Sequence, residues 1–157
     1  MNRLFLTLLL AGASSVASAA GLTVAPGTAS GYIRVDGKEY AIKYSYALAV
    51  GSDYWLLLTD AAVPNESFQG AIKVMSIGTD GKTHGLRLTL DANGKPNPIM
   101  ILQVESATGN LDWQTFELSK AGKDALEGKT RTAAPHKGAE KTYEYDISFK
   151  APVNAVK

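Results

Sequence analysis

The sequence predicts a mainly β fold, an antiparallel β-sandwich of the immunoglobulin-like or a similar type, with at most one short helix. Two observations predict it. Apolar and polar residues alternate along most of the chain, the period of side chains on a strand. Pairs such as Asp36-Gly37 and Asn93-Gly94 separate these stretches, and such pairs favour tight hairpin turns. Six to eight short strands on this spacing are typical of a sandwich or a small barrel.

The first strands are expected to form a hairpin. Residues 30–35 and 39–47 alternate in polarity on either side of Asp36-Gly37. Tyrosine or isoleucine occupies every second position of the second stretch, and the intervening side chains are small or charged. The sequence therefore predicts that one face points inward, made of Tyr40, Ile42, Tyr44 and Tyr46.

The next stretch, residues 54–59, is apolar at nearly every position, which predicts a central strand covered on both faces. After Pro64 the spacing of apolar residues matches one face of an amphipathic helix, with Asn65 as its N-cap. That face would consist of Phe68, Ala71, Ile72 and Met75. Gly70 and the β-branched Ile72 weaken the helix, so a strand over residues 71–77 is the alternative.

Two strands are expected around the Asn93-Gly94 turn. Leu86, Leu88 and Leu90 alternate with polar residues, which predicts a strand with one wet face. Residues 99–105 would return beside it. The inward set of that returning strand is expected to be Met100, Leu102 and Val104, and a further strand is expected over residues 111–118.

The last third divides into a loop-rich stretch and a clear strand. Residues 119–141 are expected to be mainly loop, with a helical turn near residues 124–127 and a short strand at residues 129–132. Strict alternation then predicts a final strand that Pro152 ends. Its inward residues would be Tyr143, Tyr145, Ile147 and Phe149, and this strand could pair with the early tyrosine strand.

The domain organisation follows from the N-terminus. Arg3, an apolar stretch and the small residues Ala17 and Ala19 predict a cleavable signal peptide over residues 1–19. We expect a flexible lead over residues 20–29, one β-rich domain over 30–152 and a tail over 153–157. The apolar stretch is too short to span a bilayer, so the mature chain is expected to be periplasmic or extracellular, without a membrane span.

Charge and composition argue against several classes of function. Without Arg3 the mature chain carries fifteen basic and fifteen acidic residues, which does not predict nucleic-acid binding. No cysteine is present, and His84 and His136 lie far apart in sequence, so no metal site and no cofactor are expected. We interpret both histidines as solvated turn residues. Their alternative is a site assembled with Asp80 or Glu140.

Two short motifs resemble functional ones but have simpler interpretations. Ser30 lies in a glycine-containing stretch that lacks the full nucleophile elbow, so we interpret this stretch as a flexible lead into the first strand. Asp91 and Asn93 resemble the start of a calcium loop, yet the acidic residue that completes such a loop is missing. A hairpin turn explains these two residues. No catalytic residue is therefore assigned.

Aromatic residues are the remaining candidates for binding. Tyrosine and tryptophan at a β-surface can stack on sugars or anchor a protein partner. With the inward tyrosines set aside, the ligand-binding candidates are Tyr32, Tyr54, Trp55 and Trp113. The alternative is that these four fill the core or its rim.

Four segments together resemble small secreted bacterial β-rich proteins of uncharacterised function: residues 31–38, 44–47, 56–60 and 145–149. The resemblance implies a β-rich fold and transfers no catalytic or binding residue. Our leading hypothesis is an exported non-catalytic β-domain that binds a protein or glycan of the cell envelope. One alternative is a small periplasmic hydrolase whose site is assembled from distant His, Asp and Glu residues. The other is a structural or assembly protein acting through strand-edge pairing, and the oligomeric state stays open.

Overall fold

The computed structural model describes residues 24–155. The predicted signal peptide lies outside the described residues. Eleven strands, one α-helix and one 3₁₀ helix are formed within them. The strands are β1 Gly27–Val35, β2 Lys38–Ala41, β3 Tyr44–Val50, β4 Asp53–Thr59, β5 Gly85–Leu90, β6 Pro96–Ile101, β7 Glu105–Ala107, β8 Gln114–Ala121, β9 Ala125–Thr132, β10 His136–Lys137 and β11 Thr142–Ala155. The helices are η1 Asn65–Phe68 and α1 Ala71–Ser76.

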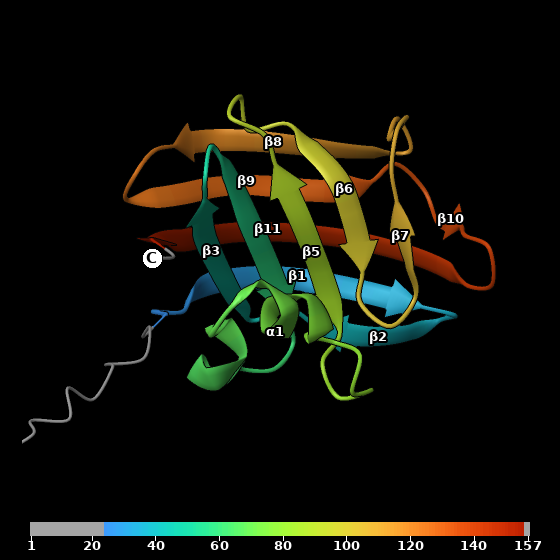
Figure 1. The fold of residues 1–157 in the computed structure, drawn as a ribbon. Coiled ribbons are helices and arrows are strands. Elements are labelled where there is room, and N and C mark those ends of the chain that lie inside the picture. Colours follow the sequence, from blue (N-terminus) through green and yellow to red (C-terminus); the bar gives the residue numbers. More distant parts are fainter. Residues whose placement is uncertain (1–23, 156–157) are drawn as a thin grey trace, which may run out of the picture.

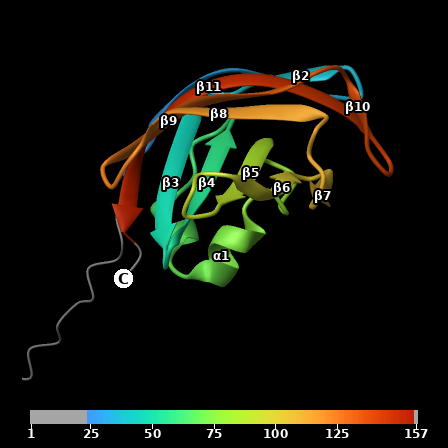
Figure 2. The same ribbon diagram turned by 90° about the horizontal axis from the view of Figure 1, so that it is seen from above.

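All the described strands belong to one curled sheet. Its order is β7-β6-β5-β4-β3-β1-β11-β9-β8, with β2 paired to β1 and β10 to β11. Figures 1 and 2 show β8, β9, β11 and β1 as one long curved layer, with β3 to β6 crossing beneath it and α1 on the far side of these. Every pairing is antiparallel except the short one between β11 and β3. The mainly β class is confirmed, whereas the immunoglobulin-like sandwich is not, because the strands hydrogen-bond into one continuous sheet.

Two clusters of buried side chains hold the fold together. The larger one lies inside the curl and includes Leu56 and Leu88 from the crossing strands and Ile147 from β11. The smaller one lies between the outer side of β3 and β4 and the helices, and includes Leu57 and Phe68. Strand β4 contributes to both clusters, which confirms the prediction of a strand covered on both faces.

The first hairpin is confirmed, but its inward face is not continuous. Asp36 and Gly37 both have positive φ angles, as a tight turn between β1 and β2 requires. The predicted second strand divides into β2 and β3. Ile42 packs in the larger cluster and Tyr46 in the smaller one, so the predicted single tyrosine face is wrong. The break between β2 and β3 moves the later tyrosines to the other side of the sheet.

The helix is confirmed, with a different buried face from the one predicted. Ile72 is 84% exposed and Met75 is 55% exposed, whereas Val74 and Ile77 are buried together with Phe68. The reason is length: a helix of six residues is too short for its own periodicity to choose its orientation, so the tertiary contacts of Phe68 and Val74 decide it.

The predicted N-cap is also corrected. Asn65 is the first residue of η1, and it makes no capping hydrogen bond with the turn that follows. Its side-chain Oδ1 instead accepts the main-chain N–H of Val24 at 3.0 Å. Val24 is buried in the smaller cluster, and β1 begins at Gly27, three residues before the expected strand. Ser30, the first residue of the expected strand, pairs with Ser148 in the β1–β11 ladder.

Strand β5 has the predicted pattern, but β6 has the reverse. Leu86, Leu88 and Leu90 are fully buried. On β6, Ile99 and Ile101 face the larger cluster, while Met100 only packs against the smaller one. Leu102 is buried as expected, in the smaller cluster, but the predicted set of Met100, Leu102 and Val104 does not form one strand face. Strand β6 ends at Ile101, and the chain turns through Gln103, whose φ is 65°.

The C-terminal third contains more strand than predicted. The expected helical turn near residues 124–127 is instead the start of β9, which pairs with β11 from Arg131 opposite Asp146 to Ala125 opposite Pro152. Strand β11 does not end at Pro152: the Val153 N–H bonds the Asp124 carbonyl at 2.9 Å, and residues up to Ala155 pair with β3. The expected pairing of the two tyrosine strands thus occurs only at this short parallel contact.

Candidate functional site

The curl brings one edge of the sheet against a distant hairpin turn. Strand β8 is an outer strand that pairs with β9 alone, and the β5–β6 turn lies beside it (Figures 1 and 2). The contact is close: a Cβ on Gly94 would lie 2.6 Å from Leu118 Cδ1, so the leucine side chain would have to move to accommodate it. We call this junction the seam, meaning the line between β8 and residues 90–97.

Two hollows lie along the seam, one on each side of the Gly94–Leu118 contact. The larger, which we call the seam groove, has a volume of about 530 Å³, within the 300–1,000 Å³ typical of ligand sites. The smaller has about 170 Å³ and includes Tyr54 and Leu118 in its lining. The seam groove is lined by Asp91, Lys95, Pro96, Asn97, Gly109, Asn110, Leu111, Asp112, Gln114 and Phe116.

Two turns shape opposite rims of the seam groove through their own side chains. Asp91 Oδ1 accepts the main-chain N–H groups of Asn93 and Lys95, both at 2.9 Å, so this carboxylate sets the β5–β6 turn. This arrangement supports the hairpin interpretation of Asp91. On the other rim, Asn110 Nδ2 donates to Asp112 Oδ2 at 2.9 Å. Both rims therefore present side chains that are already ordered.

The floor of the groove is a buried polar group. Gln114 is 8% exposed, and its Oε1 accepts a hydrogen bond of 3.2 Å from the hydroxyl of Thr130, which is fully buried. Thr130 Oγ1 also lies 3.1 Å from the Thr115 carbonyl oxygen. The hydroxyl of Tyr145 faces this group but makes no hydrogen bond of normal geometry within the described residues. Burial raises the pKa of Tyr145 well above its usual value, so the hydroxyl stays neutral.

A second polar hollow, of about 270 Å³, contains His84. Asp60 accepts the main-chain N–H of His84 (2.8 Å), and its Oδ2 lies 3.0 Å from the ring Nδ1, so the carboxylate orients the imidazole. The ring of Tyr40 stacks on the imidazole with centroids 3.6 Å apart. His84 is thus half-buried and oriented, which corrects the expectation of a solvated turn residue.

His136 belongs to a different cluster. Its ring stacks on Trp113, with centroids 4.4 Å apart, and lies beside Tyr143. Glu105 Oε1 accepts the Tyr143 hydroxyl at 2.8 Å, and its Oε2 accepts the Ala139 N–H at 2.8 Å. Glu105 therefore ties β7 to the segment between β10 and β11. The expectation of a solvated turn is wrong for this histidine as well.

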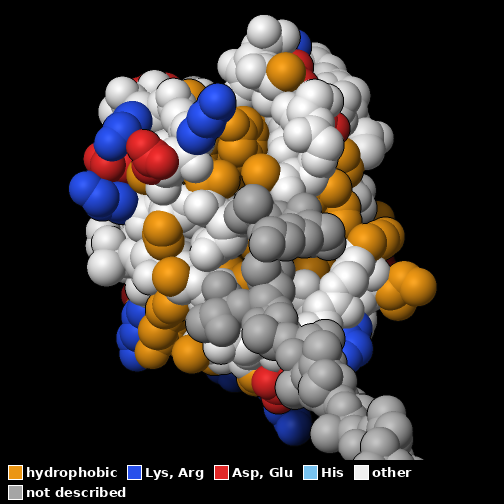
Figure 3. Space-filling model, turned by 60° about the vertical axis from the view of Figure 1, so that its left-hand side comes forward, with side chains coloured by type: hydrophobic (Ala, Val, Ile, Leu, Met, Phe, Trp, Pro, Cys, Tyr) orange, Lys and Arg blue, Asp and Glu red, His pale blue; other side chains and the backbone are white. Residues whose placement is uncertain are grey.

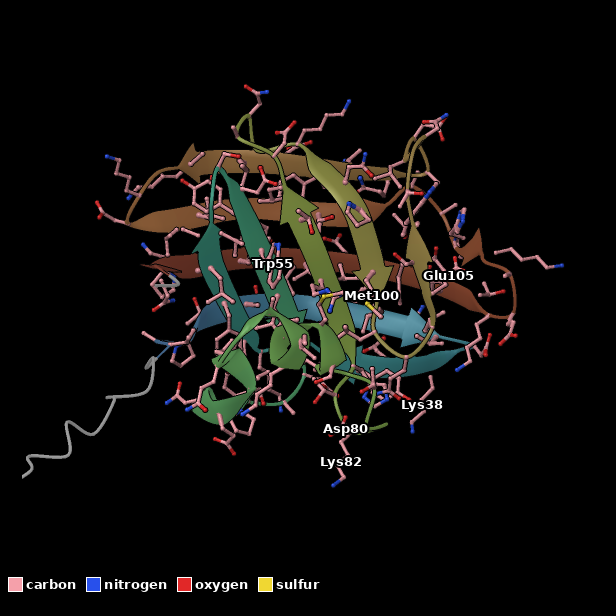
Figure 4. The ribbon with its side chains drawn as sticks, viewed as in Figure 1. Lys38, Trp55, Asp80, Lys82, Met100 and Glu105 are labelled. Atoms are coloured by element: carbon pink, nitrogen blue, oxygen red, sulfur yellow. The ribbon has the colours of Figure 1, made fainter. Side chains whose placement is uncertain are left out.

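The four predicted aromatic residues are not brought together. Tyr54 and Trp113 pack against the larger cluster and Trp55 against the smaller one, while Tyr32 lies under the Arg34 guanidinium at 5.1 Å. Figure 4 shows Trp55 on the side of the sheet that carries α1. Each of the four is half-buried, so they form no shared exposed platform. Only Tyr54, in the smaller hollow, borders the seam.

Exposed apolar and metal-binding features are sparse in the described chain. Ile72 and Met75 are the large hydrophobic side chains classed as exposed there. Figure 3 shows hydrophobic side chains in several separate groups on the face it presents. Across residues 24–155 no cluster of three or more His, Cys, Asp or Glu side chains is placed to hold a metal ion. None of the helices described is long and apolar enough to cross a bilayer.

Sequence reasoning missed Asn97, Asp112, Gln114 and Phe116 as site residues. The only signal for them was their position beside turns, which every strand end shares. Comparison of the chain with family models, curated proteins and solved structures found no match. Function is therefore inferred from the geometry of the hollows.

Proposed function

We propose that this chain is an exported, non-catalytic β-domain that binds a glycan of the cell envelope in the seam groove. The observation that carries the proposal is the lining of the groove. Carboxylate and amide side chains on both rims, Asp91, Asn97 and Asp112, can bond the hydroxyl groups of a sugar, and Phe116 offers an apolar surface. The rims are pre-ordered by their own hydrogen bonds, which lowers the entropic cost of binding.

A matched pair of variants tests this proposal. Asp112→Ala removes a rim carboxylate, while Glu117→Ala removes one from β8 that does not line the groove. We expect Asp112→Ala to weaken glycan binding about 5-fold or more, the loss of one hydrogen bond to a charged group. Glu117→Ala should bind like the wild type. Isothermal titration calorimetry of the signal-free chain against envelope oligosaccharides measures both.

Two results would contradict the proposal. Equal weakening by both variants would move the ligand away from the groove. Retention of an envelope protein, with no glycan bound at any concentration tested, would replace the ligand class by a protein partner.

A second candidate function, a small hydrolase, is favoured by the contact between His84 and Asp60. An imidazole oriented by a carboxylate can act as a general base. The lining of its hollow contains no serine, threonine or cysteine, so the base would have to activate water. Cleavage of a model ester or glycoside that disappears in His84→Gln and is kept in Asp112→Ala would favour this candidate over binding.

Strand-edge assembly has less support from β8 itself. The register of β8 shifts between Leu118 and Lys120, and Glu117 and Lys120 are exposed on this edge strand. Such shifts and charges are means by which edge strands avoid pairing with another chain. A monomer at all concentrations in light scattering would agree with this reasoning.

A further inference from the structure

The side chain of Gln114 is hydrogen-bonded to Thr130 at the floor of the seam groove. It is the buried polar residue of the lining, and its Oε1 is occupied by the Thr130 hydroxyl at 3.2 Å. Buried amide groups require hydrogen-bond partners on both ends. With Oε1 occupied, the N–H groups of Nε2 are the part of Gln114 left to bond a molecule in the groove.

Beneath the floor, the hydroxyl of Thr130 lies within hydrogen-bond distance of two carbonyl oxygens. Thr130 has one hydroxyl proton, and two oxygens lie within reach of it, Gln114 Oε1 and the Thr115 carbonyl. Tyr145 is 1% exposed, and its hydroxyl has no hydrogen-bond partner among the described residues. The single Thr130 proton serves these two oxygens, so the donors of Gln114 that remain for a ligand are the N–H groups of Nε2. A ligand that fits this floor must bring an oxygen that accepts a hydrogen bond.

The walls of the groove, unlike the floor, offer a hydrogen-bond acceptor and apolar surface. Asp112 is an exposed carboxylate that accepts hydrogen bonds, while Leu111 and Phe116 are half-buried apolar side chains. An acetamido group has one complement for each feature: a carbonyl oxygen for Gln114 Nε2, an N–H for the carboxylate, and a methyl for the apolar pair. A free amine lacks the carbonyl, and a hydroxyl lacks the methyl.

We propose that the seam groove selects sugars bearing an N-acetyl group, and that Gln114 determines this specificity by donating to the acetamido carbonyl. The inference rests on the proposed function, because it names the class of glycan for the same groove. It assigns a role to a residue that the aromatic pattern of the sequence did not indicate.

Three oligosaccharides of equal length and linkage test the selectivity. They are built from N-acetylglucosamine, from glucosamine and from glucose. We expect calorimetry on the signal-free chain to show binding at least about tenfold tighter for the N-acetylated sugar than for either of the others, because those two lack the hydrogen bond to Gln114 and the buried methyl group. If all three bind equally and Asp112→Ala weakens all of them, the groove binds glycans but the N-acetyl inference is wrong. If none binds, the proposed function itself fails.

Variants of Gln114 test its role. Gln114→Met keeps the length of the side chain and removes its donors, so the preference for the N-acetylated sugar should fall to near unity. Gln114→Glu offers oxygens in place of the amide N–H groups and should do the same. Tyr145→Phe removes the neighbouring hydroxyl and leaves Gln114 in place, so it should keep the preference. Thermal unfolding of each variant checks that it is folded. An unchanged preference in a folded Gln114→Met protein would overturn the assignment.

Discussion

Gly85→Ala is expected to destabilise the domain by about 3 kcal/mol or more, from positive-φ strain and steric overlap together. Gly85 opens β5 with a φ of 147°, a conformation that side chains rarely adopt. It also lies directly against β4: a Cβ at this position would overlap the main-chain carbonyl oxygen of Leu58. The strand cannot move aside, because Gly85 pairs with Thr59 and its carbonyl accepts the Leu102 N–H at 3.0 Å. Urea unfolding measures the loss.

Two other glycines separate the causes of that loss. Gly37 has a φ of 81° but nothing within 4 Å of a Cβ, so Gly37→Ala measures backbone strain alone, about 1 kcal/mol. Gly122 has neither a positive φ nor a close neighbour, so Gly122→Ala should change stability by less than about 0.5 kcal/mol. If Gly85→Ala proved no more costly than Gly37→Ala, the close approach of β4 and β5 would not be a constraint.

Alternation predicted strands well where a strand keeps one register. Tyr143, Tyr145, Ile147 and Phe149 are all buried as expected, because β11 runs without a break between β1 and β9. The same pattern gave a wrong prediction for Tyr40 to Tyr46, since the regular strand is interrupted between β2 and β3 and continues with the opposite face inward. No local feature of those residues marks such a break.

Partly covered elements were harder to predict. Phe68 is buried as predicted, but Ile72 and Met75 are exposed and Val74 is buried instead. Contacts with β3 and β4 override periodicity in a helix of six residues. Only the second half of β9, residues 129–132, was predicted, for a related reason. Its residues are largely polar and glycine-containing, and pairing with β8 and β11 makes it a strand.

The candidate site depends on contacts that sequence patterns do not carry. Asp91 and Asp112 come from separate turns, and the curl of the sheet brings those turns to opposite rims of one groove. A prediction of strand order would have been needed to place them together. Aromatic content was a poor guide, because Trp113 stacks on His136 and Trp55 covers the helix side of the sheet.

The second large effect is expected at alkaline pH. Burial raises the pKa of Tyr145 well above its usual 10, and burial together with the hydrogen bond to Glu105 does the same for Tyr143. Folding therefore favours the protonated form of both. Below pH 10 this preference does not change the free energy of unfolding, since the folded and the unfolded chain both hold the proton. Above it the unfolded chain loses protons that the folded chain keeps, so the free energy of unfolding falls by about 1.4 kcal/mol per pH unit for each tyrosine.

Two variants separate the contributions of Tyr145 and Tyr143 to this loss of stability at alkaline pH. Tyr145→Phe removes one titrating hydroxyl that makes no hydrogen bond of normal geometry with the described residues, so stability at neutral pH should be unchanged or higher by about 1 kcal/mol. The fall in unfolding free energy per pH unit should lose the contribution of one tyrosine. Tyr143→Phe should lower the slope equally but cost stability at neutral pH, because Glu105 loses its donor. Urea unfolding across pH 9 to about 11, followed with tyrosinate absorbance, gives both quantities. A slope unchanged in Tyr145→Phe would mean that this hydroxyl ionises as readily in the folded chain as in the unfolded one. The polar group beneath Gln114 would then be open to water rather than sealed under the groove.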